Sequence, residues 1–478
     1  MFQVLIAKKT ILKLFVLQTL KGIKMAALNR KATSLSFSTT HEGGVARNQS
    51  INMQLERSVM SCLLWEDSFY EDGISIATRI ANLVEIATPS FVAVLALRAR
   101  NDMKIRHVSL LLIRELIRKQ DCRKYANILE EICTRPDDIT EFMKLYWKDG
   151  KVPIANSVKK ALSNVFSKFD EYQLAKYNQN NEIKLRDVMF MVHAKPESNM
   201  ARYNAQDRKA YKDVSLTEQE SLYKRLVDNQ LASPETWENR LSRGEDKKEV
   251  FESLMSEDKL GALAFLRNLR NMSQANVDKD IIYGYAKNLN VDKILPYQFI
   301  TAARINPMYE DMLEPLMMKC MNGIEKVSGK TRILIDVSGS MDDNISGRGE
   351  TKRIDAATGL AIIAREMFND VEIFTFSQKV VQVQPRRGFA LRDAVLNSQA
   401  HSSTILGMAL QHVDSSEIDR LIVLTDEQSS DTIHSPKAKN AYMINVAAYK
   451  NSVAFGKWNS ISGWSEAVLK YIVSLEKL

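Results

Sequence analysis

Three polar side chains alternate in the stretch RILIDVSGSMDD, where an apolar run ends at Asp336 and is followed by Ser338 and Ser340. Side chains at alternate positions of an extended turn point to the same side, so one carboxylate and two hydroxyls would converge there. Small polar residues in such a turn often cap the helix that follows a strand. The alternative is that their oxygen atoms bind a divalent metal ion.

Two later segments predict further oxygen ligands at the same edge of a sheet. Thr404 lies in the polar turn HSST that opens a helix, and Asp426 directly follows the apolar run LIVLT. In an open α/β sheet, ligands bind outside the carboxyl ends of the strands. All five groups are hard oxygens, which suits Mg²⁺ best and Mn²⁺ or Ca²⁺ less well. The pattern therefore predicts a magnesium site, and helix capping stays open for Ser340 and Thr404.

The same turn does not fit the common enzymatic motifs. A phosphotransferase of the DxDx(T/V) type needs a second carboxylate two residues after the first, and Ser338 holds that position. The run GSMDDNISGRG also lacks the Lys-Ser or Lys-Thr pair of a phosphate-binding loop. Six histidines are spread along the chain; His401 precedes Thr404 and is either a neighbour of the metal or a surface residue. We therefore expect a protein that is not an enzyme.

These residues need a sheet to position them, and the chain from Gly329 onward has the pattern for one. Apolar runs alternate with helical segments, which predicts a doubly wound, mostly parallel α/β sheet covered by helices on both faces. We expect strands at 332–336, 371–377, 380–384, 420–426 and 441–448, and helices at 354–368, 403–413 and 465–477.

Between about Ile51 and Lys326 the pattern is helical almost throughout. Segments such as INMQLERSVMSCLLW and GALAFLRNLRNM carry apolar residues at spacings of three and four, and short turns such as ATPS and TRPDD separate them. Many amphipathic helices in antiparallel pairs predict a stack of helical hairpins, which is an α-solenoid. No fixed sequence period is evident, so an irregular helical domain is the alternative.

The length and charge of the chain add weaker constraints. A chain of 478 residues is long enough for two or three domains. Its net charge of +8 is uneven, since residues 329–478 hold 17 basic and 17 acidic residues, whereas residues 1–24 hold five basic and no acidic ones. We interpret 1–24 as a spurious or disordered extension before Met25, rather than an amphipathic arm or a targeting peptide. Its apolar run is too short to span a bilayer.

Four scattered cysteines favour buried thiols and a cytoplasmic protein.

A second concentration of polar residues lies between Lys151 and Lys212, which contains 12 basic and 6 acidic residues. The run LAKYNQNNEIKLRDVMFMVHAKP combines basic side chains with amides, a tyrosine and a histidine, and such groups contact phosphates and bases. A solvated helix face without a partner has the same composition. Composition alone therefore leaves RNA binding and a bare surface both open.

The scattered set of DxSxS, Thr and Asp resembles the metal-ion-dependent adhesion site of von Willebrand factor A domains. The resemblance implies one divalent cation, most readily Mg²⁺, with water and one outside ligand completing its shell. The chain supplies all five members of the set, namely Asp336, Ser338, Ser340, Thr404 and Asp426.

A helical module followed by one such domain resembles the TROVE-module Ro ribonucleoprotein family. The likeness is carried by LAKYNQNNEIKLRDVMFMVHAKP, LGALAFLRNLRNM and LPYQFITAARI. It implies HEAT-like helical repeats at 25–328, closed into a monomeric ring by the A domain at 329–478. It also implies a scaffold for RNA quality control that has no membrane partner. The implied partners are small structured noncoding RNAs, the single-stranded 3′ ends of misfolded RNAs, and a ribonuclease.

Carried over by position, seven residues become candidates for RNA contact. Asn180 stands where the family has an arginine, so the surface for duplex RNA is either weaker or tuned to a different RNA. A protein-interaction module, in which a partner's acidic side chain completes the metal shell, is the alternative function. The candidate RNA contacts are Lys159, Lys160, Lys176, Gln179, Arg186, His193 and Lys195.

Overall fold

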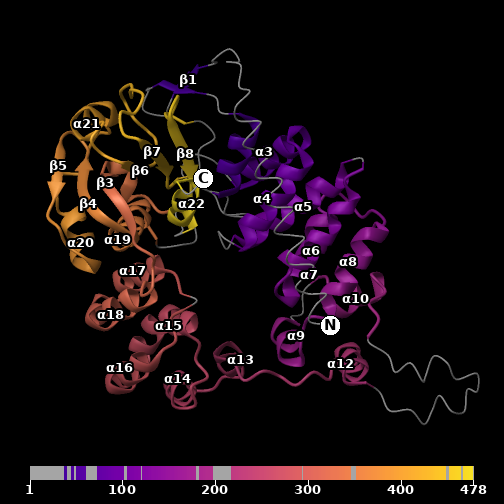
Figure 1. Ribbon diagram of the computed structural model, residues 1–478. Coiled ribbons are helices and arrows are strands. Elements are labelled where there is room, and N and C mark those ends of the chain that lie inside the picture. Colours follow the sequence, from indigo (N-terminus) through magenta and orange to yellow (C-terminus); the bar gives the residue numbers. More distant parts are fainter. Residues whose placement is uncertain are drawn as a thin grey trace, which may run out of the picture. The chain divides into compact units, whose positions relative to one another are not determined.

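The structure is a computed structural model, and its described residues form two compact units (Figure 1). Unit 1 comprises Ala81–Glu235, and unit 2 comprises the described residues up to Ile80 together with those from Thr236 onward. The described residues are 37–39, 45–47, 50–60, 73–101, 105–119, 121–178, 182–196, 217–292, 294–345, 351–447, 452–463 and 467–476. Residues 1–24, the expected extension, lie outside these ranges.

Unit 1 consists of helices that pack through their apolar faces. Its elements are α4 (Pro89–Asn101), α5 (Arg106–Arg118), η1 (Arg123–Ile128), α6 (Leu129–Ile132), α7 (Pro136–Tyr146), α8 (Asn156–Phe166), α9 (Glu171–Tyr177), α10 (Leu185–Met191) and α12 (Glu218–Val227), entered through α3 (Gly73–Ile86). In α8, Val158, Leu162 and Val165 are buried at spacings of three and four, whereas Lys160 is exposed. Helix α7 contacts α8, α9 and α10, and α4 contacts α5. The predicted helical array is confirmed here.

Unit 2 combines a shorter helical array with the predicted α/β domain. Its helices before the sheet are α2 (Ile51–Met60), α13 (Trp237–Ser242), α14 (Lys247–Ser256), α15 (Ala262–Gln274), α16 (Lys279–Asn288), α17 (Pro296–Ile305), η3 (Pro307–Tyr309) and α18 (Glu310–Cys320). Helix α17 contacts α15 and α18, and α14 contacts α16. The helices from α13 to α18 thus pack in the same unit as the sheet, although the strand pattern begins only at Val327.

The sheet of unit 2 has six strands in the order β5-β4-β3-β6-β7-β8. Every neighbouring pair is parallel except β4 and β5, so the sheet is mostly parallel, as predicted. The elements are β3 (Val327–Asp336), η4 (Gly339–Asp342), α19 (Arg353–Met367), β4 (Phe368–Phe376), β5 (Val380–Val383), α20 (Gly388–Leu396), α21 (Leu406–Val413), β6 (Arg420–Thr425), β7 (Asn440–Asn445), β8 (Trp458–Ser462) and α22 (Ala467–Glu476).

Helices cover both faces of this sheet. Strand β6 is buried at every position, which requires cover on either side. On one face, Leu406 and Leu410 of α21 join Leu334, Phe374 and Val423 in a single buried cluster. The alternate residues of these strands point to the opposite face. Helix α19 contacts β3 and β4 and reaches α22.

Two short strands before α2, and one helix and one strand of the sheet domain, were not predicted from the sequence. The segment before α2 contains the antiparallel strands β1 (Phe37–Thr39) and β2 (Val45–Arg47). Helix α20 and strand β8 were not expected. Within the described ranges, no helix has the length and apolarity that crossing a membrane would require.

Candidate metal centre and nucleic-acid interface

The two predicted carboxylates lie at the carboxyl ends of neighbouring parallel strands. Asp336 is the last residue of β3 and Asp426 follows β6, and these strands pair through Ile335 and Leu424. Asp336 accepts hydrogen bonds from the backbone N–H of Ser338 (2.9 Å) and from the hydroxyl of Thr425 (2.6 Å). Both carboxylates are fully buried. The sheet therefore brings together two charges that lie 90 residues apart in the sequence.

The other predicted ligands lie on loops that hydrogen bonds join to the same edge. The hydroxyl oxygens of Ser338 and Ser340 are 3.3 Å apart. The carbonyl of Ser402 accepts from the N–H of Gly339 at 3.0 Å, which ties the Thr404 loop to the DxSxS turn. The carbonyl of Thr404 accepts from the N–H of Ser430 at 3.0 Å, which ties it to the loop after Asp426. All three predicted segments thus converge.

Arg353, which the sequence did not single out, supplies a positive charge to this cluster. Its Nη1 atom lies 3.2 Å from Oδ2 of Asp426 and donates to the carbonyl of Ser340 at 3.0 Å. The guanidinium is buried, although an arginine at the first position of a helix opposes the helix dipole. That unfavourable position was the signal in the sequence that could have identified it.

The charge balance of the cluster fits a cation. Burial first, and then the charge of Asp426, raise the pKa of Asp336 to about 7. One buried guanidinium faces two buried carboxylates, so a further positive charge would stabilise the ionised pair. The described residues contain no group of three or more His, Cys, Asp and Glu side chains placed to hold a metal. A cation here would therefore bind two carboxylates and hydroxyls, which is an all-oxygen set suited to Mg²⁺.

Glu427 anchors the loop after Asp426 to the beginning of the described chain. Its Oε1 lies 3.1 Å from Nη1 of Arg57 in α2, and its Oε2 accepts from the N–H of Val453 at 3.0 Å. Arg57 also donates to the hydroxyl of Ser460 in β8. Glu427 and Arg57 are both buried, and Glu427 adopts a φ of 59°, an uncommon conformation for a glutamate. This buried pair fixes the backbone beside the candidate ligand Asp426.

His401 lies beside the DxSxS turn and is not a surface residue. Its Nδ1 is 2.8 Å from Oδ2 of Asp342, and its Nε2 is 3.1 Å from the carbonyl of Leu396. Its side chain is only 19% exposed. The histidine therefore links the turn to the loop that carries Thr404.

The candidate RNA contacts lie in unit 1, on or next to helices that share contacts with α7. Lys160, Lys176, Arg186, His193 and Lys195 are exposed, and Lys159 is half-buried. Arg186 has a carboxylate neighbour, Asp187, at 3.4 Å, an exposed pair of little energetic weight. Gln179 lies outside the described residues.

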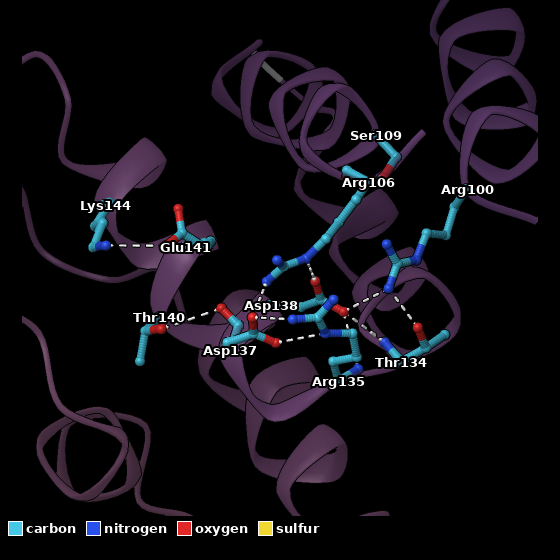
Figure 2. A network of polar contacts seen from close by, with 10 residues as sticks. All are labelled: Arg100, Arg106, Ser109, Thr134, Arg135, Asp137, Asp138, Thr140, Glu141 and Lys144. Carbon is cyan, nitrogen blue, oxygen red and sulfur yellow. Dashed lines mark hydrogen bonds and ion pairs between the residues drawn. The ribbon is translucent and has the colours of Figure 1, made fainter. Parts of the chain in front are cut away.

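A network of ion pairs around the buried Asp138 lies at the start of α7 (Figure 2). Asp138 accepts from Nη2 of Arg100 at 2.7 Å and from Nε of Arg106 at 2.5 Å. It also caps α7 through the N–H of Arg135 at 2.9 Å. Asp137 binds the Arg135 side chain through two hydrogen bonds, of 3.0 and 2.6 Å. Three guanidinium groups thus meet two carboxylates and leave one net positive charge.

Arg135 also lines a small pocket on the surface. Its guanidinium lies 4.4 Å above the ring of Tyr177. Tyr172 and Lys176 line the same pocket, whose volume is about 220 Å³. The sequence TRPDD predicts a turn, and this pattern alone does not single out Arg135. The proline and acidic residues that follow Arg135 are a helix-start signal that could have drawn attention to it.

A helical array combined with a mostly parallel six-stranded α/β domain defines a class of protein that joins a helical module to a domain with the von Willebrand factor A fold. The profile of the TROVE domain matches residues 12–230 and 224–332. The chain therefore belongs to the TROVE domain family.

A solved structure shows the same fold. The crystal structure of the Ro (RSR) protein of Deinococcus radiodurans is similar over 88% of this chain and 99% of that chain, with a TM-score of 0.54 and 17% sequence identity. No curated protein matches the chain.

Proposed function

We propose that this protein binds small structured noncoding RNAs and the single-stranded 3′ ends of misfolded RNAs, and acts as a ribonucleoprotein scaffold in RNA quality control. The observation that carries the proposal is the exposure of Lys160, Lys176 and Lys195 around α7 in a chain of the TROVE domain family. The protein performs no chemistry of its own, works in the cytoplasm as a monomeric ring, and presents RNA to a ribonuclease partner.

Binding of this kind draws its affinity mainly from the phosphate backbone. Each lysine that neutralises a phosphate releases condensed counterions, so affinity falls steeply with salt. Tyr172 is 55% exposed next to Lys176 and offers a face on which an unpaired base can stack. Duplex RNA presents few readable base edges, so the surface selects RNA by shape and single-stranded character.

We further propose that the oxygen cluster of unit 2 holds Mg²⁺ through Asp336, Ser338, Ser340, Thr404 and Asp426. The ion would supply the positive charge that the two buried carboxylates lack, and would leave a coordination position for an anionic oxygen. An acidic side chain of a protein partner fits that position. A metal-dependent protein-interaction module that binds no RNA is therefore the alternative function.

The test of RNA binding is the double substitution Lys176→Glu and Lys195→Glu. We expect the affinity for a structured RNA to fall by about tenfold or more across unrelated sequences, because two phosphate contacts become repulsive. The slope of log affinity against log salt should decrease by about 0.9 for each phosphate contact that is lost. Fluorescence anisotropy with labelled RNA, over a series of salt concentrations, measures both quantities.

A matched control carries the same change of charge elsewhere. Lys279→Glu with Lys287→Glu alters two exposed lysines of α16 in unit 2 and should leave the affinity near that of the unchanged protein. If the two double variants bind equally well, the basic helices of unit 1 are not the RNA surface.

A further inference from the structure

A second polar pocket lies within unit 2, between helices α15 and α17 and the residue Thr351. Its volume is about 470 Å³, inside the range of about 300–1,000 Å³ that is common for small-ligand sites. Arg267 and Arg270 of α15 lie one turn apart and both line it, as does the ring of Tyr297 from α17. None of the predicted RNA contacts or metal ligands belongs to this pocket.

The floor of the pocket is held rigid by contacts with the α/β domain. The hydroxyls of Thr301 and Thr351 are 3.1 Å apart, which joins α17 to the segment before α19. Arg304 of α17 donates from Nε to Asp355 of α19 at 3.1 Å. An added Cβ on Gly359 of α19 would lie 3.3 Å from the Cδ1 atom of Ile300, so α17 packs tightly against α19 at this glycine. A pocket that is formed in advance loses little free energy to ordering when a ligand binds.

The side chains that line the pocket favour a ligand that has both an anionic group and a planar ring. No acidic residue is found among the described residues that line it, and Arg267 is exposed with no carboxylate of the described chain within ion-pair distance. Arginines bind phosphate through paired hydrogen bonds. Asn271 and Gln298 supply amides that can pair with a base edge, and Tyr297 supplies an aromatic ring. A bare phosphate would fill only a small part of the volume.

We propose that this pocket binds one nucleotide, with its phosphate against Arg267 and Arg270 and its base beside Tyr297. The nucleotide is either free or one unit of a single-stranded RNA, and only the second source rests on the proposed function. A free nucleotide and a nucleotide within RNA present the same phosphate and base, so the experiment must distinguish between them.

The experiment measures the binding of free uridine 5′-monophosphate by calorimetry and of a labelled short oligouridylate by anisotropy, using the full chain. We expect saturable binding of at least one of them. Arg267→Glu with Arg270→Glu should weaken that binding at least about tenfold, because charged hydrogen bonds to phosphate are lost. Lys279→Glu with Lys287→Glu, on the neighbouring helix α16, is the matched control and should bind normally.

A second readout does not depend on affinity. An oligonucleotide that ends in 4-thiouridine should crosslink on irradiation to the peptides of α15 or α17, and excess uridine 5′-monophosphate should suppress the crosslink if free nucleotide also binds. Thr351→Val, which removes one hydroxyl from the pocket wall and keeps its shape, should weaken binding by only a few-fold.

The outcomes separate this inference from the proposed function. Binding of the free nucleotide that is lost in the arginine variant supports the pocket even if structured RNA does not bind at all. If the arginine variant binds both ligands as the unchanged protein does, or if neither ligand binds the unchanged protein, the pocket assignment is overturned. Loss of structured-RNA binding only in the Lys176 and Lys195 variant would then leave the proposed function standing without it.

Discussion

Asp336 lies in an environment that disfavours the ionised form of its carboxylate. Burial and the nearby Asp426 raise its pKa to about 7, although Ser338 and Thr425 both donate hydrogen bonds to it. Arg353 contacts Asp426, whereas no basic side chain of the described structure lies within ion-pair distance of Asp336. The two carboxylates repel each other, and a divalent cation would stabilise the cluster because it interacts with both at once.

The substitution Asp336→Asn tests this balance. In the unchanged protein we expect Mg²⁺ to raise the melting temperature, since a ligand at 100 times its Kd adds about 2.7 kcal/mol to the free energy of unfolding. In the variant the shift should vanish, because one of the two carboxylates is lost. Without Mg²⁺ the variant should melt at or above the temperature of the unchanged protein. Thermal melts after chelation and after addition of Mg²⁺ measure both effects.

Asp370→Asn is the control, because it removes the same charge from an exposed position near the start of β4, away from the carboxyl end of the sheet. This variant should keep the Mg²⁺-dependent shift. A shift that survives in Asp336→Asn, or disappears equally in both variants, would contradict the assignment of Asp336 as a ligand.

At the scale of the element, helix α21 begins where two backbones approach closely. The N–H groups of Gly407 and Met408 donate to the carboxylate of Asp431 at 2.8 and 2.9 Å. A Cβ on Gly407 would lie 2.4 Å from the carbonyl oxygen of Thr432. The missing side chain therefore lets the loop after β6 close over the start of α21 and hold Thr404 beside the cluster.

Gly407→Ala should consequently affect stability and cation binding together. We expect the free energy of unfolding to fall by about 1–3 kcal/mol, the usual cost of forcing extra volume into a packed site. The Mg²⁺ affinity should fall as well, because the Thr404 loop must move. Urea unfolding and Mg²⁺ titration provide the two measurements.

Gly284→Ala is the matched control for this substitution. Gly284 lies within α16, and an added Cβ there meets nothing within 4 Å. Alanine favours the helix by up to about 1 kcal/mol over glycine, so this variant should be more stable. If Gly407→Ala proved as stable as Gly284→Ala, close approach would not be the reason for the glycine.

The elements show what the sequence can and cannot predict. Strands β3, β6 and β7 each contain an apolar run, so their positions in the sequence were evident, and with them the edge that carries Asp336 and Asp426. Strand β8, with the sequence WNSIS, has little apolar pattern and forms only because β7 offers it a parallel partner. The pairing of Arg353 with Asp426 and the pocket beside Thr351 depend on contacts between distant segments, which local periodicity does not encode.

At the scale of the whole molecule, the chain departs from unit 2 after Ile80 and returns to it at Thr236. The described part of unit 1 is therefore joined to unit 2 at both of its ends. Within unit 2, α2 is held to β8 and to the loop after Asp426 by the buried pair of Arg57 and Glu427. Removing one member of such a pair costs about 3–5 kcal/mol, so helix α2 is firmly attached to β8 and to the loop after Asp426.

This connectivity predicts a monomer in solution. The contacts of α2 with β8 are formed within one chain, and an intramolecular contact has an effective concentration far above that of a second protein molecule. Light scattering during gel filtration should therefore give a mass of 54.3 kDa at every protein concentration. A domain-swapped dimer, in which α2 of one copy packs on β8 of another, would preserve every contact described but double the mass. A stable species of twice the mass would therefore contradict the prediction, and its dissociation on substitution of Arg57 by leucine would identify α2 as the exchanged element.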